Sequence, residues 1–363
     1  MATRIAEKWS RSGFGSKAVS VVIAAACVLP IGAGTALAAE VPAAGDTVVH
    51  PDARTPADQK RIEDYWTTEK MASVTQPGVP EPVKDNADRL PDQDRTKPTD
   101  GAVWGNGPIK SVGRLFATTL LVDPWGGKQL QDRSCTATVV SDPENPSKRT
   151  VVTASHCVVG HPYFKDGQPG YPDWSRPEWD TNLYFVPGYR DGAKPQGGFT
   201  VNTTLASRAY VEGGDSGADV AMLAMNPSTG GQQIAQVTGA QKVAFETARH
   251  EGQFTYDFGY TSEGGEDRQP WKTGQLLGFC AGPATKSTSP QTDPAQWGMA
   301  CTMGKGSSGG PHFVDFDPAT STGTVVGVNC QAGQGANGER IQAAAAFTST
   351  TRQLYELAQQ QDQ

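Results

Sequence analysis

One octapeptide, Gly-Lys-Gly-Ser-Ser-Gly-Gly-Pro at 304–311, constrains the fold of this chain more than any other stretch. Glycine adopts backbone conformations that other residues avoid, so the chain can turn tightly here and leave Ser308 at the apex. In such a turn the backbone N–H groups of Gly306 and Ser308 can converge on one point. Gly-Ser runs are also common in flexible linkers, so the octapeptide alone does not indicate a functional turn, and other segments of the chain must be considered.

Two upstream segments offer such partners. A serine hydroxyl is a weak nucleophile at neutral pH and needs a base beside it. The β-branched run that begins at Val151 predicts a strand that leads directly into His156 and Cys157. Asp219 stands at the mouth of a second short apolar strand. Taken singly, the histidine could be a core residue beside a structural disulfide, and the aspartate could be a turn residue.

The three segments run His, Asp, Ser in chain order, each at the edge of a predicted strand. Their sequences are Thr-Ala-Ser-His-Cys, Asp-Val-Ala-Met-Leu and Gly-Ser-Ser-Gly-Gly-Pro. In these motifs and their order the chain resembles the chymotrypsin-like serine proteases, over roughly residues 105–357. The resemblance implies that Ser308 is the nucleophile, His156 its general base and Asp219 the partner that orients the histidine. It also implies an oxyanion hole made by the N–H groups of Gly306 and Ser308.

The expected fold class is all-β. Apolar runs between turn residues predict a first group of strands near 112–121, 135–140, 150–154, 183–187, 199–206 and 219–225. A second group is expected near 242–247, 254–259, 273–281, 298–303, 311–316, 324–330 and 342–347, followed by a helix over 350–360. The resemblance, rather than the strand count, implies two six-stranded Greek-key β-barrels in a protease domain over 105–363, with the active site between them.

The first 104 residues differ from the rest. Basic residues precede an apolar run over 18–29 and a small-x-small site at 36–38, a pattern typical of a signal peptide over 1–38. Residues 39–104 are expected to form a linker, or a propeptide that lies on the enzyme and is cut away. Thr55 predicts the start of an amphipathic helix around 56–72. The acidic, proline-rich stretch that follows, through 98, is too polar to bury a core.

Composition narrows the partners. A net charge of −7 with only 19% charged residues leaves no basic stripe to grip phosphates, which argues against a nucleic-acid partner. We expect a secreted, extracellular monomer that acts on protein or peptide substrates and makes no membrane contact after signal removal. Neither a CxxC nor a His-x-x-x-His spacing supports a metal site, and the expected chemistry requires no cofactor.

Removal of Cys27 with the signal peptide would leave five cysteines: Cys135, Cys157, Cys280, Cys301 and Cys330. In an oxidising compartment these should mostly pair. The resemblance implies a Cys135–Cys157 bridge that fixes the histidine loop, and Cys280–Cys301 as a clip under the wall of the specificity pocket. Cys301–Cys330 is the alternative pairing. The odd count leaves one thiol over, expected to be Cys330.

Several positions depart from familiar members of the family. Ser307 stands where pancreatic-type members carry an aspartate that captures a newly freed N-terminus, which favours the bacterial, glutamyl-endopeptidase-like branch. Thr302 occupies the pocket floor in place of the aspartate of trypsin-like members. Met303 and Asn329 stand where glutamyl endopeptidases use a threonine and a histidine. These three residues are expected to line a pocket without a fixed charge.

Two interpretations stay open at this point. The aromatic insertion over 160–184 is either a self-packed surface loop or a wall of the substrate cleft. His161 and His250 are expected at the surface, and His312 behind the nucleophile turn. The class-level alternative to a protease is an inactive homologue that binds a protein or peptide through the same cleft. An esterase could use the same acyl chemistry, but the Ser, Asp, His order of α/β-hydrolases is absent.

Overall fold

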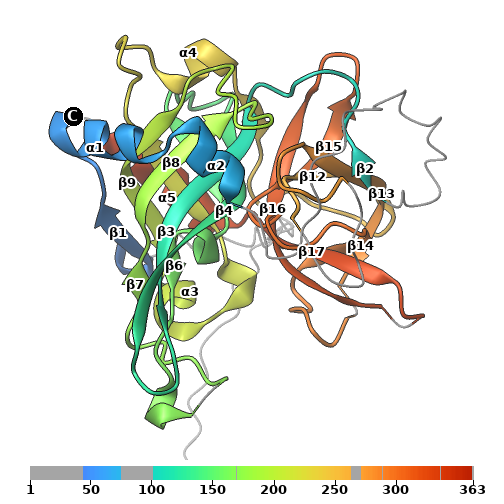
Figure 1. Ribbon diagram of the computed structural model, residues 1–363. Coiled ribbons are helices and arrows are strands. Elements are labelled where there is room, and N and C mark those ends of the chain that lie inside the picture. Colours follow the sequence, from blue (N-terminus) through green and yellow to red (C-terminus); the bar gives the residue numbers. More distant parts are fainter. Residues whose placement is uncertain are drawn as a thin grey trace, which may run out of the picture. The chain divides into compact units, whose positions relative to one another are not determined.

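The computed structural model describes residues 44–74, 101–168, 170–262, 271–287, 289–335 and 337–361 (Figure 1). All of them belong to one compact unit, Glu40–Gln363. The predicted signal peptide over 1–38 and the acidic, proline-rich stretch up to 98 lie outside the described residues, so both stay predictions.

Six strands close a first barrel. They are β3 (Val112–Val122), β4 (Lys128–Ser141), β5 (Thr150–Thr153), β8 (Thr181–Pro187), β9 (Phe199–Ser207) and β10 (Ala221–Met225). They pair in the order β4-β3-β8-β9-β10-β5, and pairing of β4 with β5 closes the ring. Inward-facing side chains from every strand, among them Leu115, Val139 and Phe185, pack into one buried core. Closure leaves these strands with few free edges.

A second barrel is built in the same way. Its strands are β12 (Gln253–Gly259), β13 (Gly278–Lys286), β14 (Trp297–Ala300), β15 (Pro311–Asp317), β16 (Thr322–Gln334) and β17 (Arg340–Ala346). They follow the order β15-β12-β13-β14-β17-β16, closed by β15 with β16. Numbered from one to six along the chain, the strands of both barrels run 1-2-3-6-5-4 around the ring. The prediction of an all-β fold with two six-stranded Greek-key barrels is confirmed.

Three predicted strands differ most from the structure, and one of them, expected near 298–303, is β14, which ends at Ala300. The strand expected near 242–247 is β11 (Gln241–Val243), which pairs in parallel with β4 and β16 and so joins the barrels instead of entering one. The strand expected over 273–281 begins only at Gly278, because Gly274 adopts a φ of +74° that a strand cannot include. The strands β1 (Thr47–Pro51), β2 (Ala102–Val103), β6 (Val159–Gly160) and β7 (Glu178–Trp179) were not predicted.

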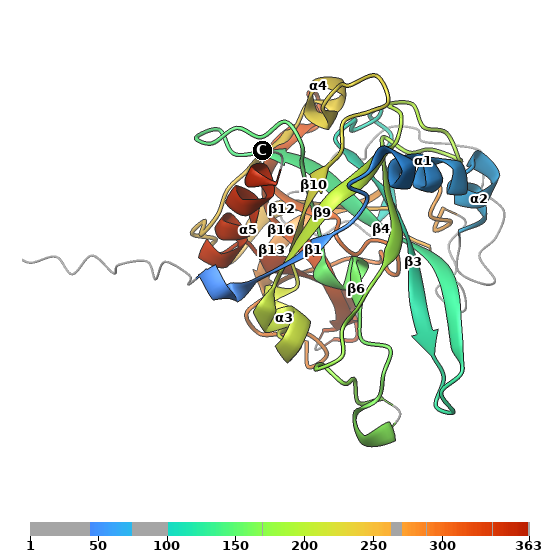
Figure 2. The same cartoon turned by 90° about the vertical axis from the view of Figure 1, so that its left-hand side faces the viewer.

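Helices are short and lie outside the barrels. They are α1 (Pro56–Tyr65), α2 (Thr68–Ser73), α3 (Arg208–Gly213), α4 (Ile234–Thr238) and α5 (Ser349–Gln360), with single 3₁₀ turns η1 (Ala44–Asp46), η2 (Ser155–Cys157), η3 (Lys165–Gly167) and η4 (Ser216–Ala218). The terminal helix α5 matches its prediction and packs on β9 and β10 (Figure 2). Among the described residues, none of the helices has the length and apolar character needed to span a bilayer.

The helix predicted around 56–72 is in fact two helices. Thr55 caps α1 as expected, since its side chain accepts a hydrogen bond from the Asp58 N–H. The chain then leaves the helical conformation at Trp66, and Thr67 starts α2 by accepting from the Lys70 N–H. A second threonine cap therefore outweighs the helical spacing of the apolar residues.

The segment 44–74 packs against the outside of the first barrel (Figure 1). Strand β1 pairs antiparallel with β9 over five residues. The indole of Trp66 is fully buried and donates to the Asn182 carbonyl at 2.6 Å. Met71 is also fully buried and belongs with Trp66 to the same apolar cluster as Phe116.

Arg114 adds hydrogen bonds to the apolar contacts between the segment 44–74 and the first barrel. Its side chain is fully buried on β3, and burial lowers its pKa. Its guanidinium donates to the Met71 carbonyl at 3.4 Å and to the Val74 carbonyl. It also donates to Ser134 Oγ at 2.9 Å and the Tyr189 hydroxyl at 3.3 Å. The barrel thus contains a buried cation that is solvated in part by the end of α2.

Replacing Trp66 by alanine should therefore destabilise the whole first barrel. We expect a loss of about 3–5 kcal/mol in the free energy of unfolding for Trp66→Ala, the range for a large aromatic removed from a core. Trp125, which is 90% exposed, provides the control, and Trp125→Ala should change the free energy of unfolding by no more than about 0.5 kcal/mol. Equilibrium urea unfolding of both variants measures this. Equal effects would contradict an integral role for the segment.

Candidate active site

The turn at 304–311 is held by contacts that only glycine allows. Gly306 and Gly309 have φ values of +89° and +76°. A Cβ on Gly309 would collide with Thr153 Oγ1 and the Thr136 carbonyl, and would lie 3.0 Å from the Ala154 nitrogen. A Cβ on Gly310 would collide with the Phe258 carbonyl. The turn is therefore close-packed, which excludes the flexible-linker interpretation.

The packing also fixes two peptide groups of the turn. The Lys305 carbonyl accepts from the Ser262 N–H at 2.7 Å, and the Ser307 carbonyl accepts from the Gly310 N–H at 2.9 Å. In a trans peptide the N–H points away from the carbonyl. The next N–H groups, those of Gly306 and Ser308, therefore point away from these partners. Among the described residues neither donates to another group of the protein.

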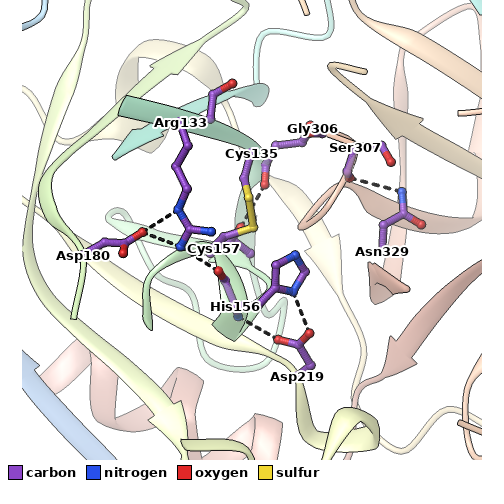
Figure 3. The surroundings of a disulfide bond; sticks show 12 residues. Arg133, Cys135, His156, Cys157, Asp180, Asp219, Gly306, Ser307 and Asn329 are labelled. Carbon is purple, nitrogen blue, oxygen red and sulfur yellow. Dashed lines mark hydrogen bonds and ion pairs between the residues drawn. A yellow bond between two sulfur atoms is a disulfide. The ribbon is translucent and has the colours of Figure 1, made fainter. Parts of the chain in front are cut away.

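His156 and Asp219 are bonded to each other twice (Figure 3). Nδ1 of the imidazole lies 2.7 Å from Asp219 Oδ2, and the His156 backbone N–H donates to Oδ1 at 2.9 Å. The Asp219 carboxylate is buried, whereas the histidine side chain is 29% exposed. A carboxylate only accepts hydrogen bonds, so Nδ1 is the donor to Asp219.

The disulfide Cys135–Cys157 joins β4 to the histidine loop beside this pair (Figure 3). A second disulfide joins Cys280 to Cys301, and Cys330 is free and buried, as predicted. Cys135, His156 and Cys157 bring three possible metal-ligand atoms together. The two sulfur atoms are bonded to each other, however, and a disulfide offers no thiolate to a metal.

Comparison with solved structures finds proteases of similar fold. The Arthrobacter nicotinovorans protease Anisep is 27% identical over 70% of this chain and 97% of its own, with a TM-score of 0.52. The thermostable serine protease AL20, from an extremophilic microorganism, is 25% identical over 69% of this chain and 98% of its own, with a TM-score of 0.51. A Glu endopeptidase is 18% identical over 74% and 98%, with a TM-score of 0.48. No family model and no curated protein matches the sequence.

This chain has the fold of the chymotrypsin-like serine proteases. In this fold His156 and Asp219 belong to the first barrel, and the turn that carries Ser308 belongs to the second. The branch within the family stays a prediction, because the Glu endopeptidase is too distant to decide it.

The residues predicted to line a specificity pocket lie in different surroundings. Thr302 is half-buried, and a Cβ on Gly101 would lie 2.7 Å from its hydroxyl. Met303 is fully buried in an apolar cluster with the Cys280–Cys301 disulfide. Asn329 is fully buried and donates to the Asp257 carboxylate and to the Ser307 carbonyl. The amide of Asn329 therefore faces the back of the nucleophile turn, and its place in a specificity pocket stays a prediction.

Behind the turn lies a buried polar group that the motifs do not reveal. His312 lies there as predicted, with Nε2 3.6 Å from Asp257 Oδ2, and both side chains are fully buried. Burial raises the pKa of Asp257, while the nearby His312 and the hydrogen bond from Asn329 oppose that rise. Asp257 had no sequence signal, since it lies in the middle of the apolar strand β12.

The aromatic insertion is anchored rather than self-contained. The ring of His161 lies 4.1 Å from that of Trp174, and its Nε2 lies 2.8 Å from the Val211 carbonyl. Trp174 also packs edge-on against Tyr210 of α3. His161 was expected at the surface, but it is half-buried, and burial lowers its pKa. His250 is exposed as expected.

The close packing at Gly309 can be tested apart from backbone strain. Gly126 also has a positive φ of +87°, but no atom lies near its Cβ position. Both Gly→Ala variants should suffer the backbone penalty of about 1–2 kcal/mol. Gly309→Ala should lose about 1–3 kcal/mol more, because its methyl group must displace Thr153 and Thr136. Equilibrium unfolding compares the two, and equal losses would contradict a close-packed turn.

Proposed function

We propose that this chain is a secreted serine endopeptidase whose catalytic residues are Ser308, His156 and Asp219. The observation that carries the proposal is the contact between the two barrels at Gly309. This residue, directly after Ser308, packs against Ala154, two residues before His156. This contact supports a nucleophile and a base that come from different barrels, and the bond between His156 and Asp219 supports the role of Asp219 in orienting that base.

The proposed reaction is acyl transfer to water. Ser308 Oγ attacks the peptide carbonyl while Nε2 of His156 takes its proton, and the C–N bond breaks as that proton passes to the leaving amine. Water then attacks the acyl-enzyme, again with His156 as base, and releases the acid and the free Ser308. Asp219 keeps the proton on Nδ1 and stabilises the imidazolium that forms in each step.

Gly306 and Ser308 are proposed to bind the oxyanion. Their N–H groups face away from the bonded carbonyls of Lys305 and Ser307, so they can donate to a negative oxygen without reorganisation. The proposal needs no metal or cofactor for any step.

Secretion is proposed on two grounds. The N-terminal pattern predicts a signal peptide over 1–38, and the described residues contain two disulfides. Disulfides persist in oxidising compartments and are rare in the cytosol.

Single replacements of the three residues test the chemistry. His156→Ala, Asp219→Asn and Ser308→Ala should each lower peptide turnover by roughly 10³- to 10⁶-fold while the protein stays folded, because triad members act as a unit. His250→Ala, at an exposed histidine, is the control and should leave turnover unchanged. Turnover of a peptide substrate and labelling by a fluorophosphonate probe are the two measurements. A wild-type protein that is not labelled would instead support an inactive, peptide-binding homologue.

Specificity provides a separate test. The half-buried Thr302 and the apolar surroundings of Met303 offer no fixed charge to a buried substrate side chain. Burial of an unpaired Lys, Arg or Glu costs several kcal/mol. We therefore expect cleavage after small or medium uncharged residues and weak cleavage after charged ones. Profiling with a peptide library measures this, and a dominant charged residue at the cleavage site would refute it.

A further inference from the structure

One arginine reaches the main chain of the histidine from the side opposite Asp219 (Figure 3). Arg133 lies on β4 two residues before Cys135, so both side chains leave the same face of the strand. That face carries the Cys135–Cys157 disulfide and therefore the histidine loop. Arg133 Nη2 donates to the His156 carbonyl at 2.7 Å.

Asp180 fixes the guanidinium in this position. Arg133 Nε donates to Asp180 Oδ2 at 2.7 Å, and Nη2 donates to the same oxygen. The Asp180 carboxylate is only 1% exposed, whereas the Arg133 side chain is 27% exposed. The Asp180 backbone N–H in turn donates to the Val158 carbonyl at 2.9 Å. These bonds close a ring that runs from His156 through Arg133 and Asp180 back to Val158.

The two peptide groups that flank the His156 Cα are thus held from two different strands. Its N–H is bonded to Asp219 beside β10, and its carbonyl is bonded to Arg133 on β4. A histidine whose Cα cannot shift presents its imidazole in one place. Proton transfer from serine to Nε2 is sensitive to that place, since displacements near 1 Å can cost roughly 100-fold in rate.

The chemistry of the pair suits a positioning role. Arginine presents a planar fork that can bond a carboxylate and a carbonyl together, whereas lysine offers a single point charge. The charged groups recorded around the imidazole are Asp219, Arg133 and Asp180. Because Arg133 and Asp180 neutralise each other, the carbonyl is held without net charge added beside the imidazolium.

We propose that Arg133 and Asp180 are positioning residues that hold the catalytic histidine loop. The inference rests on the proposed function and deepens it. Neither residue touches the reacting atoms, so neither is a catalytic residue. The pair acts on His156 through its backbone, and its loss should lower kcat while KM stays nearly constant.

The experiment compares three variants of the full chain with one control. Arg133→Lys keeps the charge but loses the fork. Asp180→Asn loses the negative charge of the acceptor. Arg133→Met/Asp180→Asn removes both charges and leaves no buried carboxylate without a cation. The control is Lys70→Met, which breaks the partly buried Lys70–Asp132 ion pair at the residue next to Arg133 on β4.

We expect kcat for a peptide substrate to fall about 10- to 100-fold in all three variants, with KM within about twofold of wild type. Fluorophosphonate labelling should slow in parallel, since it needs the same base. Lys70→Met should leave both rates within about twofold of wild type, as expected for a surface pair. Variants that fold, lose thermal stability and yet match the control in kcat would overturn the inference.

A second readout separates this inference from the proposed function. The Nδ1–H proton of His156 should give a downfield NMR resonance, assigned by its loss in Asp219→Asn. It should shift or broaden in the Arg133 and Asp180 variants and stay unchanged in Lys70→Met. An unlabelled wild type would overturn the proposed protease, and this resonance would still decide the inference. An unchanged resonance in every Arg133 and Asp180 variant would reject the positioning role.

Discussion

Thr136 on β4 is the residue through which the two barrels meet at the site. Its N–H donates to the Ser308 carbonyl at 2.8 Å, and its hydroxyl donates to the Gly306 carbonyl at 2.9 Å. The hydroxyl also accepts from the Tyr260 N–H, and its own carbonyl accepts from Thr153 Oγ1. Since Thr136 is fully buried, each of these bonds is shielded from water. The nucleophile turn is thereby bonded to β4, the same strand from which Arg133 and Cys135 reach the histidine loop.

The segment 44–74 serves the same barrel from outside. If it were removed, the guanidinium of Arg114 would lose its bonds to the carbonyls of Met71 and Val74, and the apolar residues packed against Trp66 and Met71 would lose their cover. Exposure of buried apolar surface to water costs free energy in proportion to its area. A propeptide that must leave its enzyme is a poor fit to such an attachment. Such an attachment favours a segment that stays with the barrel.

The motifs of the candidate site could be predicted from the sequence because each consists of residues that are neighbours in the chain. The glycines around Ser308 and the strand β5 shortly before His156 could be predicted from neighbouring residues, whereas the Cys135–Cys157 pairing came from the family resemblance. The Arg133–Asp180 pair could not be predicted, since 47 positions separate the two residues and they meet only because β4 and β8 both pair with β3. The orientation of Asn329 was missed for a related reason. The register of β16 shifts between Asn329 and Gln331, which breaks the simple alternation of faces.

That shift has a consequence for the oxyanion peptide. The Asn329 amide donates at 3.4 Å to the Ser307 carbonyl, which also accepts from the Gly310 N–H. The amide is itself oriented by its bond to Asp257, and Asp257 lies beside His312. A polar side chain at this depth would be expensive without such partners. Asn329, expected to contact the substrate side chain, thus bonds the carbonyl of the Ser307–Ser308 peptide from behind. The N–H of that peptide is the one proposed to face the substrate oxygen.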